Sequence, residues 1–109
     1  MDFSISDKQK ELRDLVRDIA DHEISPRAIE MDRKGGIDDD LMKILTSSGM
    51  TSLAVPAEYG GPGLDMVTLS ILYEELGRGC AGVATVCAAN ALASYPVLLS
   101  GSEKQKKEL

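Results

Sequence analysis

The sequence predicts an all-α domain, an up-and-down bundle of about five helices with no substantial sheet. Apolar residues recur at intervals of three and four along most of the chain. Two stretches of the form S-x-x-Q mark helix starts, and glycines and prolines separate the periodic segments. At 109 residues the chain has the length of one domain, so we treat residues 1–109 as a single unit.

The first two helices are predicted between residues 6 and 36. Ser6 and Gln9 form a capping box, and an apolar stripe then runs to about Glu23 with charged residues on the other faces. Ser25-Pro26 has the form of a cap followed by a first-turn proline, so a second helix should restart there. Gly35-Gly36 should end it.

The third and fourth helices are predicted between residues 38 and 76. Asp38 opens the third helix and Gly49 ends it, whereas Asp65 caps the fourth. Residues 51–56 should be extended, since a residue that precedes a proline avoids the helical region. The three acidic residues 38–40 could form a metal cluster, but a solvated helix start explains them, because the helix dipole favours negative charge there.

Residues 77–82 read Gly-Arg-Gly-Cys-Ala-Gly and match the dinucleotide fingerprint G-x-G-x-x-G. That fingerprint needs a preceding strand, and the preceding residues have a helical pattern. We therefore interpret this stretch as a glycine-rich turn between helices.

Between Arg78 and Glu103 the chain has no charged side chain. A helix without a charged face has to be covered on every side, by protein or by a ligand. The length would suit a membrane span, but the content is small and only mildly apolar, so we expect no membrane insertion. Pro96 should kink or end this helix. Its stripe of small residues indicates either a close helix neighbour or room for an apolar ligand.

Composition and isolated reactive residues exclude several classes of function. The net charge of −6 is spread along the chain, which argues against nucleic acid and anionic membranes as partners. Cys80 and Cys87 lack a metal-binding spacing and are expected to be free thiols. His22 has no sequence partner for catalysis and should lie at the end of the first helix. The N-terminus, Met-Asp-Phe-Ser, has neither the basic region nor the apolar region of a signal peptide. We therefore expect a cytoplasmic location.

The order of these motifs resembles the N-terminal domain of the acyl-CoA dehydrogenases. The resemblance lies in Glu23-Ile-Ser-Pro26, in residues 49–64, in Tyr73-Glu-Glu-Leu76, in the small-residue helix and in residues 101–107. The last of these stretches opens with a second capping box at Ser102, and the chain stops soon after. We therefore expect the chain to be the front part of a longer protein.

The resemblance implies a flavoenzyme that oxidises the Cα–Cβ bond of an acyl-CoA thioester, with FAD as its cofactor and an electron-transferring flavoprotein as its electron acceptor. The catalytic base would lie in a later domain, so no catalytic residue is assigned here and no FAD is expected to bind the isolated fragment. The charge-free helix would form the floor of the acyl pocket. The substrate-binding residues implied are Ala84, Thr85, Ala88, Ala89 and Leu92.

Two other functions fit the sequence. The chain could be a helical interaction module that self-associates through its charge-free helix, and a homo-oligomer is expected in either case. It could also be the N-terminal domain of a related acyl-CoA oxidase-type flavoenzyme, which shares this pattern and differs in chemistry encoded downstream.

Overall fold

The computed structural model describes residues 1–109 as helices joined by short turns, which confirms the predicted all-α class. The longer elements are α1 (Asp7–Ile19), α2 (Ala28–Lys34), α3 (Asp39–Ser47), α4 (Met66–Gly79), α5 (Ala81–Ser100) and α6 (Glu103–Lys107). A π-helical turn (Ala20–Ile24) and two 3₁₀ turns (Ser25–Arg27 and Ala57–Tyr59) complete the list.

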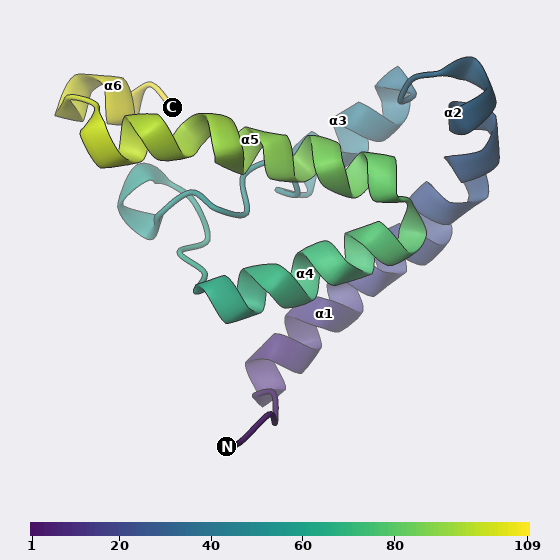
Figure 1. Cartoon of the computed structure of the whole chain (residues 1–109), viewed down its shortest axis with the longest axis horizontal. Helices are drawn as coiled ribbons and strands as arrows, with labels where there is room; N and C mark the ends of the chain where they lie inside the picture. Colours follow the sequence, from purple (N-terminus) through teal and green to yellow (C-terminus); the bar gives the residue numbers. More distant parts are fainter.

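Three helices form the frame of the molecule. Helices α1 and α4 lie side by side and run in parallel, whereas α5 returns antiparallel to α4 (Figure 1). Thirteen buried residues from α1 to α5 form one core, in which Leu41, Leu45, Leu76 and Val83 are fully buried. The domain measures 41 × 37 × 22 Å, so it is flat, and few residues are enclosed on all sides.

The predicted start of α1 is confirmed, but the predicted restart at Ser25 is wrong. Ser6 Oγ accepts a hydrogen bond from the Gln9 backbone N–H, and the Gln9 side chain accepts one in return from the Ser6 N–H. At Ser25 the backbone stays helical and no side-chain cap forms. The helix continues instead through the π-helical and 3₁₀ turns, which change its direction before α2 begins (Figure 1).

The ends of α2 and α3 lie where the glycines predict them. Gly35 and Gly49 have φ values of 78° and 80°, the left-handed conformation that ends helices at glycine. Asp38 occupies the cap position of α3, but its side chain makes no capping bond. The Asp38 carboxylate pairs with Lys34 instead.

Residues 51–55 are turns and bends and not the extended segment predicted before Pro56, and only Pro56 itself is extended. The Ser52 N–H donates to the Gly49 carbonyl at 3.1 Å, and the Val55 N–H donates to the Ser52 carbonyl at 3.1 Å. The loop that follows folds back on this segment, because a Cβ at Gly61 would lie 2.0 Å from the Val55 oxygen. Only glycine fits at that approach.

The predicted cap of α4 is confirmed, whereas the predicted turn over residues 77–82 is wrong. Asp65 Oδ1 accepts from the Thr68 N–H at 2.7 Å. Helix α4 continues through Gly79, Cys80 alone is extended, and α5 begins at Ala81. At Gly79 a Cβ would lie 3.1 Å from Ala20 Cβ, so this glycine allows α4 and the π-helical turn after α1 to approach closely.

Helix α5 does not end at Pro96 but continues to Ser100. Proline has no backbone N–H, so the Leu92 carbonyl one turn earlier lacks its usual hydrogen-bond donor. Because Pro96 is exposed, this carbonyl can bond to water instead. The second predicted capping box is confirmed: Ser102 Oγ accepts from the Gln105 N–H and starts α6.

Candidate functional site

One side of α5 is buried and the opposite side is open. The buried residues are Val83, Cys87 and Ala91, which lie on one stripe of the helix. Of the five residues predicted to contact substrate, Ala88 is half-buried and Thr85, Ala89 and Leu92 are exposed on the other side, whereas Ala84 packs against the core beside α4. This chain therefore covers α5 on one side only.

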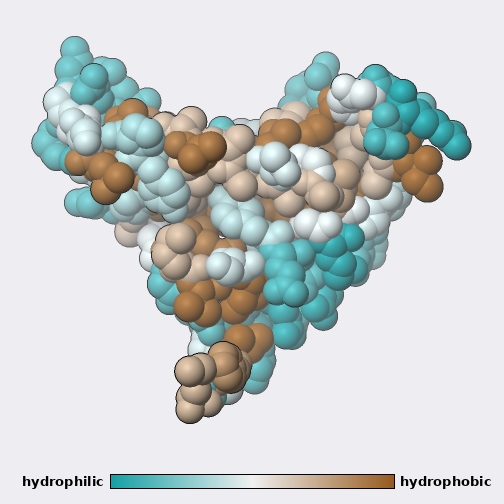
Figure 2. All heavy atoms as spheres, viewed as in Figure 1, coloured by the Kyte–Doolittle hydropathy of each residue, from teal (hydrophilic) through white to brown (hydrophobic).

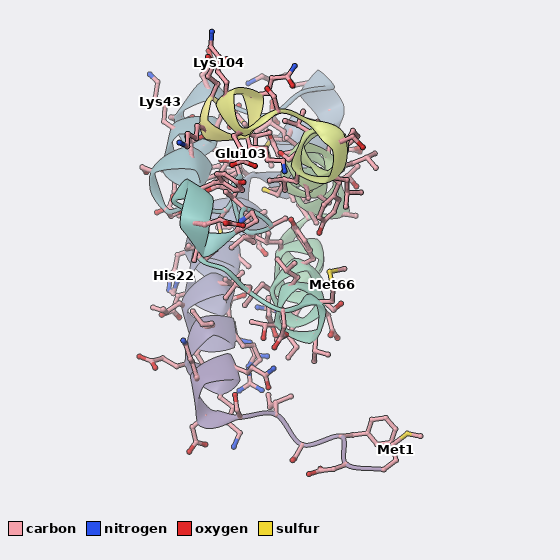
Figure 3. The ribbon with its side chains drawn as sticks, turned by 90° about the vertical axis from the view of Figure 1, so that its left-hand side faces the viewer. Met1, His22, Lys43, Met66, Glu103 and Lys104 are labelled. Carbon is pink, nitrogen blue, oxygen red and sulfur yellow. The ribbon has the colours of Figure 1, made fainter.

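The open side of α5 continues onto the start of α4. Leu92 and Leu99 are 74% and 81% exposed, and Met66 of α4 is 67% exposed. Met66 lies beside the end of α5, since the Tyr95 hydroxyl is 3.8 Å from its sulfur, and it projects away from α1 (Figure 3). Apolar side chains follow α5 and gather at the start of α4 (Figure 2). We call the set Met66, Thr85, Ala88, Ala89, Leu92, Pro96 and Leu99 the α4–α5 face.

Three polar side chains of α5 donate to carbonyls of their own helix, whereas the Tyr95 hydroxyl donates to the Met66 sulfur of α4. Thr85 Oγ1 donates to the Ala81 carbonyl at 2.9 Å, Asn90 Nδ2 donates to the Val86 carbonyl at 3.0 Å, and Ser94 Oγ donates to the Asn90 carbonyl at 2.7 Å. These bonds satisfy the polar groups within one turn. The α4–α5 face thus presents mostly methyl and methylene surface.

On the side that faces away from α5, helix α4 is joined to α1 by an ion pair. Glu75 is buried, and its carboxylate accepts from Arg17 Nη2 at 2.5 Å and from Arg78 Nε at 2.9 Å. Arg78 also donates to Asp21 at 2.7 Å. These hydrogen bonds, first those from Arg17, lower the pKa of Glu75 from 4.5 to about 2. Such a carboxylate is ionised and fully paired, so its role is structural.

The remaining reactive side chains are not arranged for catalysis. Both cysteines are free, as predicted, and burial raises the pKa of the Cys87 thiol to about 11, so it is not a nucleophile. His22 lies at the end of the first helix, as predicted, with its Nδ1 2.9 Å from the Asp18 carbonyl. No three His, Cys, Asp or Glu side chains are grouped to hold a metal ion. The G-x-G-x-x-G stretch follows a helix, which excludes a dinucleotide fingerprint.

The largest hollow of the domain lies elsewhere. A groove of about 630 Å³ runs between α1 and residues 48–64 and is lined by Leu12, Leu15, Ile19, Leu53 and Leu64 among others. A smaller cavity of about 340 Å³ lies between the end of α2 and the start of α5. None of the five predicted residues lines either one, so in this chain they form an open surface. The sequence did not reveal the groove: Leu15 belongs to the apolar stripe of α1, and only the structure shows that it is 57% exposed.

By length and composition alone, α5 is the one helix that could cross a membrane, and 11% of its most apolar window is buried. A single such helix is weak evidence for insertion, because core helices of soluble proteins pass the same test.

These features define an all-α domain whose longest helix is open along one side. Residues 6–109 match the family model described as acyl-CoA dehydrogenase, N-terminal domain, and the chain belongs to this family. A probable acyl-CoA dehydrogenase of Mycobacterium tuberculosis is 36% identical over 98% of this chain. The cyclohex-1-ene-1-carbonyl-CoA dehydrogenase of Syntrophus aciditrophicus is 36% identical over 95% of it.

Two solved structures have the same fold. The butyryl-CoA dehydrogenase of Megasphaera elsdenii superposes on all of this chain with a TM-score of 0.87 and 33% identity. A chain from a structure described as the electron transferring flavoprotein of Acidaminococcus fermentans covers 99% of it, with a TM-score of 0.90 and 28% identity. This chain spans 28% of the length of the M. tuberculosis relative and 25% of that of the S. aciditrophicus relative, and 30% and 29% of the two solved chains.

Proposed function

We propose that residues 1–109 are the N-terminal helical domain of a flavin-dependent acyl-CoA dehydrogenase, which oxidises the Cα–Cβ bond of acyl-CoA thioesters in the cytoplasm. The observation that carries the proposal is the charge-free, open α4–α5 face in a chain of this family. The one polar side chain of the face, Thr85, donates its hydroxyl to the Ala81 carbonyl, so the face suits contact with an acyl chain.

The role of the five predicted residues is to form the floor of the acyl pocket. Ala88 and Ala89 leave room beside the helix, Leu92 narrows that room further along, and Ala84 lies at its edge against α4. Thr85 contributes its methyl group, because its hydroxyl bonds to Ala81. The side chains at these positions would therefore set how long or bulky an acyl group fits.

FAD is the cofactor we propose for the full-length protein, where it would accept the hydride from the substrate. The α4–α5 face has no charged side chain to pair with the FAD diphosphate, so no residue of α5 is assigned to the cofactor. The isolated chain is expected to be inert. The proposed partners of the full-length protein are acyl-CoA, an electron-transferring flavoprotein as electron acceptor, and further copies of itself.

The experiment uses the full-length product of the gene. Reduction of its flavin by an acyl-CoA should bleach the flavin absorbance, and a colourless or unreactive protein would contradict the proposal. Bleaching followed by rapid reoxidation with oxygen, and little turnover with an electron-transferring flavoprotein, would place it with the oxidases.

The pocket floor is tested by Ala88→Leu, with Ala93→Leu as the matched control. Ala93 is exposed on α5 beyond the proposed contact residues. Ala88→Leu should lower kcat/KM for octanoyl-CoA about tenfold relative to butyryl-CoA, since a filled pocket excludes the longer chain. Ala93→Leu should leave this ratio unchanged. An equal loss with both substrates would argue against substrate contact at Ala88.

A further inference from the structure

We infer that Tyr73 of α4 is a further specificity-determining residue, whose ring fills the space that Ala88 leaves between α4 and α5 and limits how deep an acyl chain can enter there. The inference rests on the proposed function and deepens it, because it adds to the pocket floor a residue from a second helix. Tyr73 is not among the five substrate-binding residues predicted from the sequence.

Contacts at both ends of the α4–α5 pair fix its register. The helices run antiparallel and splay apart from the turn that joins them (Figure 1). Near the turn, a Cβ on Gly77 would lie 3.8 Å from Ala84 Cβ, so two small residues meet there. At the far end, the longer side chains of Met66 and Tyr95 bridge the helices, with 3.8 Å between the sulfur and the hydroxyl. The space between α4 and α5 therefore widens along the pair.

Tyr73 lies opposite Ala88 in this register. Tyr73 is one turn from Gly77 along α4, and Ala88 is one turn from Ala84 along α5, in the same direction because the helices are antiparallel. Residues four apart share a face of a helix. Counting two turns back from the contact at the far end gives the same pair. A large ring of α4 thus faces a methyl group of α5 where the helices have begun to separate.

The surroundings of Tyr73 place its ring in this space. Tyr73 is half-buried and packs against the hydrophobic core. Burial is the main cause that raises the pKa of its hydroxyl, and the two groups that add to the rise, Cys87 and Tyr95, both belong to α5. The hydroxyl has no hydrogen-bond partner in the chain, and no unpaired side-chain oxygen is buried, so the hydroxyl reaches the edge of the helix pair.

This arrangement makes the ring of Tyr73 the boundary of the pocket floor at Ala88. Ala88 is half-buried, and its methyl group shields little of the ring behind it. A shorter side chain in place of Tyr73 would leave a hollow between α4 and α5. A longer acyl chain could then bury its last methylene groups in that hollow, which favours its binding over that of a short chain.

The test compares octanoyl-CoA with butyryl-CoA as substrates of the full-length protein. Tyr73→Leu keeps an apolar side chain against the core and should raise the ratio of kcat/KM for octanoyl-CoA to that for butyryl-CoA about tenfold. Tyr73→Phe keeps the ring and should leave the ratio within about twofold. The matched control is Tyr59→Leu, because Tyr59 is also half-buried but lies in a 3₁₀ turn, where its hydroxyl bonds to Glu103. This control should leave the ratio unchanged.

A double-mutant cycle tests the contact itself by thermal unfolding of the 109-residue chain. Ala88→Leu should lower the Tm of the unmodified chain, because the added atoms meet the ring of Tyr73. In the Tyr73→Ala chain the same change should raise the Tm, because the leucine fills the vacated space. Equal shifts in the two backgrounds would overturn the contact between Tyr73 and Ala88.

An unchanged ratio in a Tyr73→Leu protein whose flavin is still bleached by butyryl-CoA would overturn the inference and leave the proposed function standing. An equal loss with both substrates would do the same, since a purely structural role of Tyr73 would weaken both. If no acyl-CoA bleaches the flavin of the unmodified protein, the proposed function fails, and the pocket role of Tyr73 fails with it. The two failures therefore give different results.

Discussion

Helix α4 meets its two neighbours in different ways. Toward α1 it presents a buried carboxylate clamped by Arg17 and Arg78, and a glycine at the closest approach. Toward α5, which has no charged residue, it forms no ion pair, and α5 then leaves its outer side open. The contact between α1 and α4 is formed entirely by residues of this chain. The outer side of α5, in contrast, is covered only if another protein segment or a ligand binds to it.

The largest expected difference lies between two leucines. Leu76 is fully buried, whereas Leu92 is 74% exposed. Leu76→Ala should lower the free energy of unfolding by about 3 kcal/mol, through lost burial and a cavity. Leu92→Ala, chemically the same change, should lower it by less than about 0.5 kcal/mol. Urea unfolding in dilute solution measures both, and similar losses would contradict the open position of α5.

Two glycines sharpen the same comparison. Gly79→Val should cost about 2 kcal/mol, because its Cβ would lie 3.1 Å from Ala20 and 3.2 Å from Ile24. Gly82→Ala in α5 meets nothing closer than the Cys80 sulfur at 3.8 Å, so it should stabilise the fold by about 0.5 kcal/mol. Thermal unfolding should therefore shift in opposite directions for the two variants.

The carboxylate of Glu75 should make stability depend on pH. Its folded pKa of about 2 lies below its ordinary value of 4.5, so its contribution is present above pH 4.5 and is lost as the pH falls toward 2. Its arginine partners are half-exposed, so we expect a contribution of about 2 kcal/mol.

Glu75→Gln should remove this contribution at neutral pH and flatten the fall in stability between pH 4.5 and 2. The control is Glu74→Gln, since Glu74 is the exposed neighbour with no ion pair within 4 Å. Chemical denaturation at several pH values measures both. If the free energy of unfolding of Glu75→Gln and of the unmodified chain changed with pH in the same way, the ion pairs of Glu75 with Arg17 and Arg78 would add no stability.

The smallest expected effect concerns how the two helices begin. Asp65 caps α4 with a 2.7 Å bond, whereas Cys80 precedes α5 without any side-chain cap. Cys80→Ser supplies an oxygen at a position whose backbone is already extended, so it should stabilise the fold by about 0.5 kcal/mol. Unchanged stability would mean that the hydroxyl does not reach the free N–H groups of α5.

Local signals predicted the helix starts well. Ser6, Asp65 and Ser102 cap helices where the sequence placed them, because a cap depends on residues only three positions apart. The acyl-CoA dehydrogenase family was also recognisable from motif order, and the match over residues 6–109 confirms it. The substrate-binding role of the five α5 residues stays a prediction.

The errors occur where a distant segment decides the local structure. Gly79 stays helical where the π-helical turn packs against it, at Ile24 and Ala20, 55 and 59 positions away in sequence. Residues 51–56 turn because the loop at Gly61 folds onto Val55. Pro96 is tolerated because it faces outward, which the sequence pattern did not reveal. The groove beside Leu15 is formed by three separate parts of the chain, so no single segment encodes it.

Thr85, Asn90 and Ser94 donate hydrogen bonds to carbonyls of their own helix, and this should affect the heat-capacity change on binding to α5. Because these groups have partners before anything covers the helix, covering α5 would exchange few hydrogen bonds and would mainly remove apolar surface from water. Titration calorimetry of any occupant, whether a second chain or an acyl group, should therefore give a negative heat-capacity change that scales with the area covered. The slope of binding enthalpy against temperature would then report how much of the helix has been enclosed.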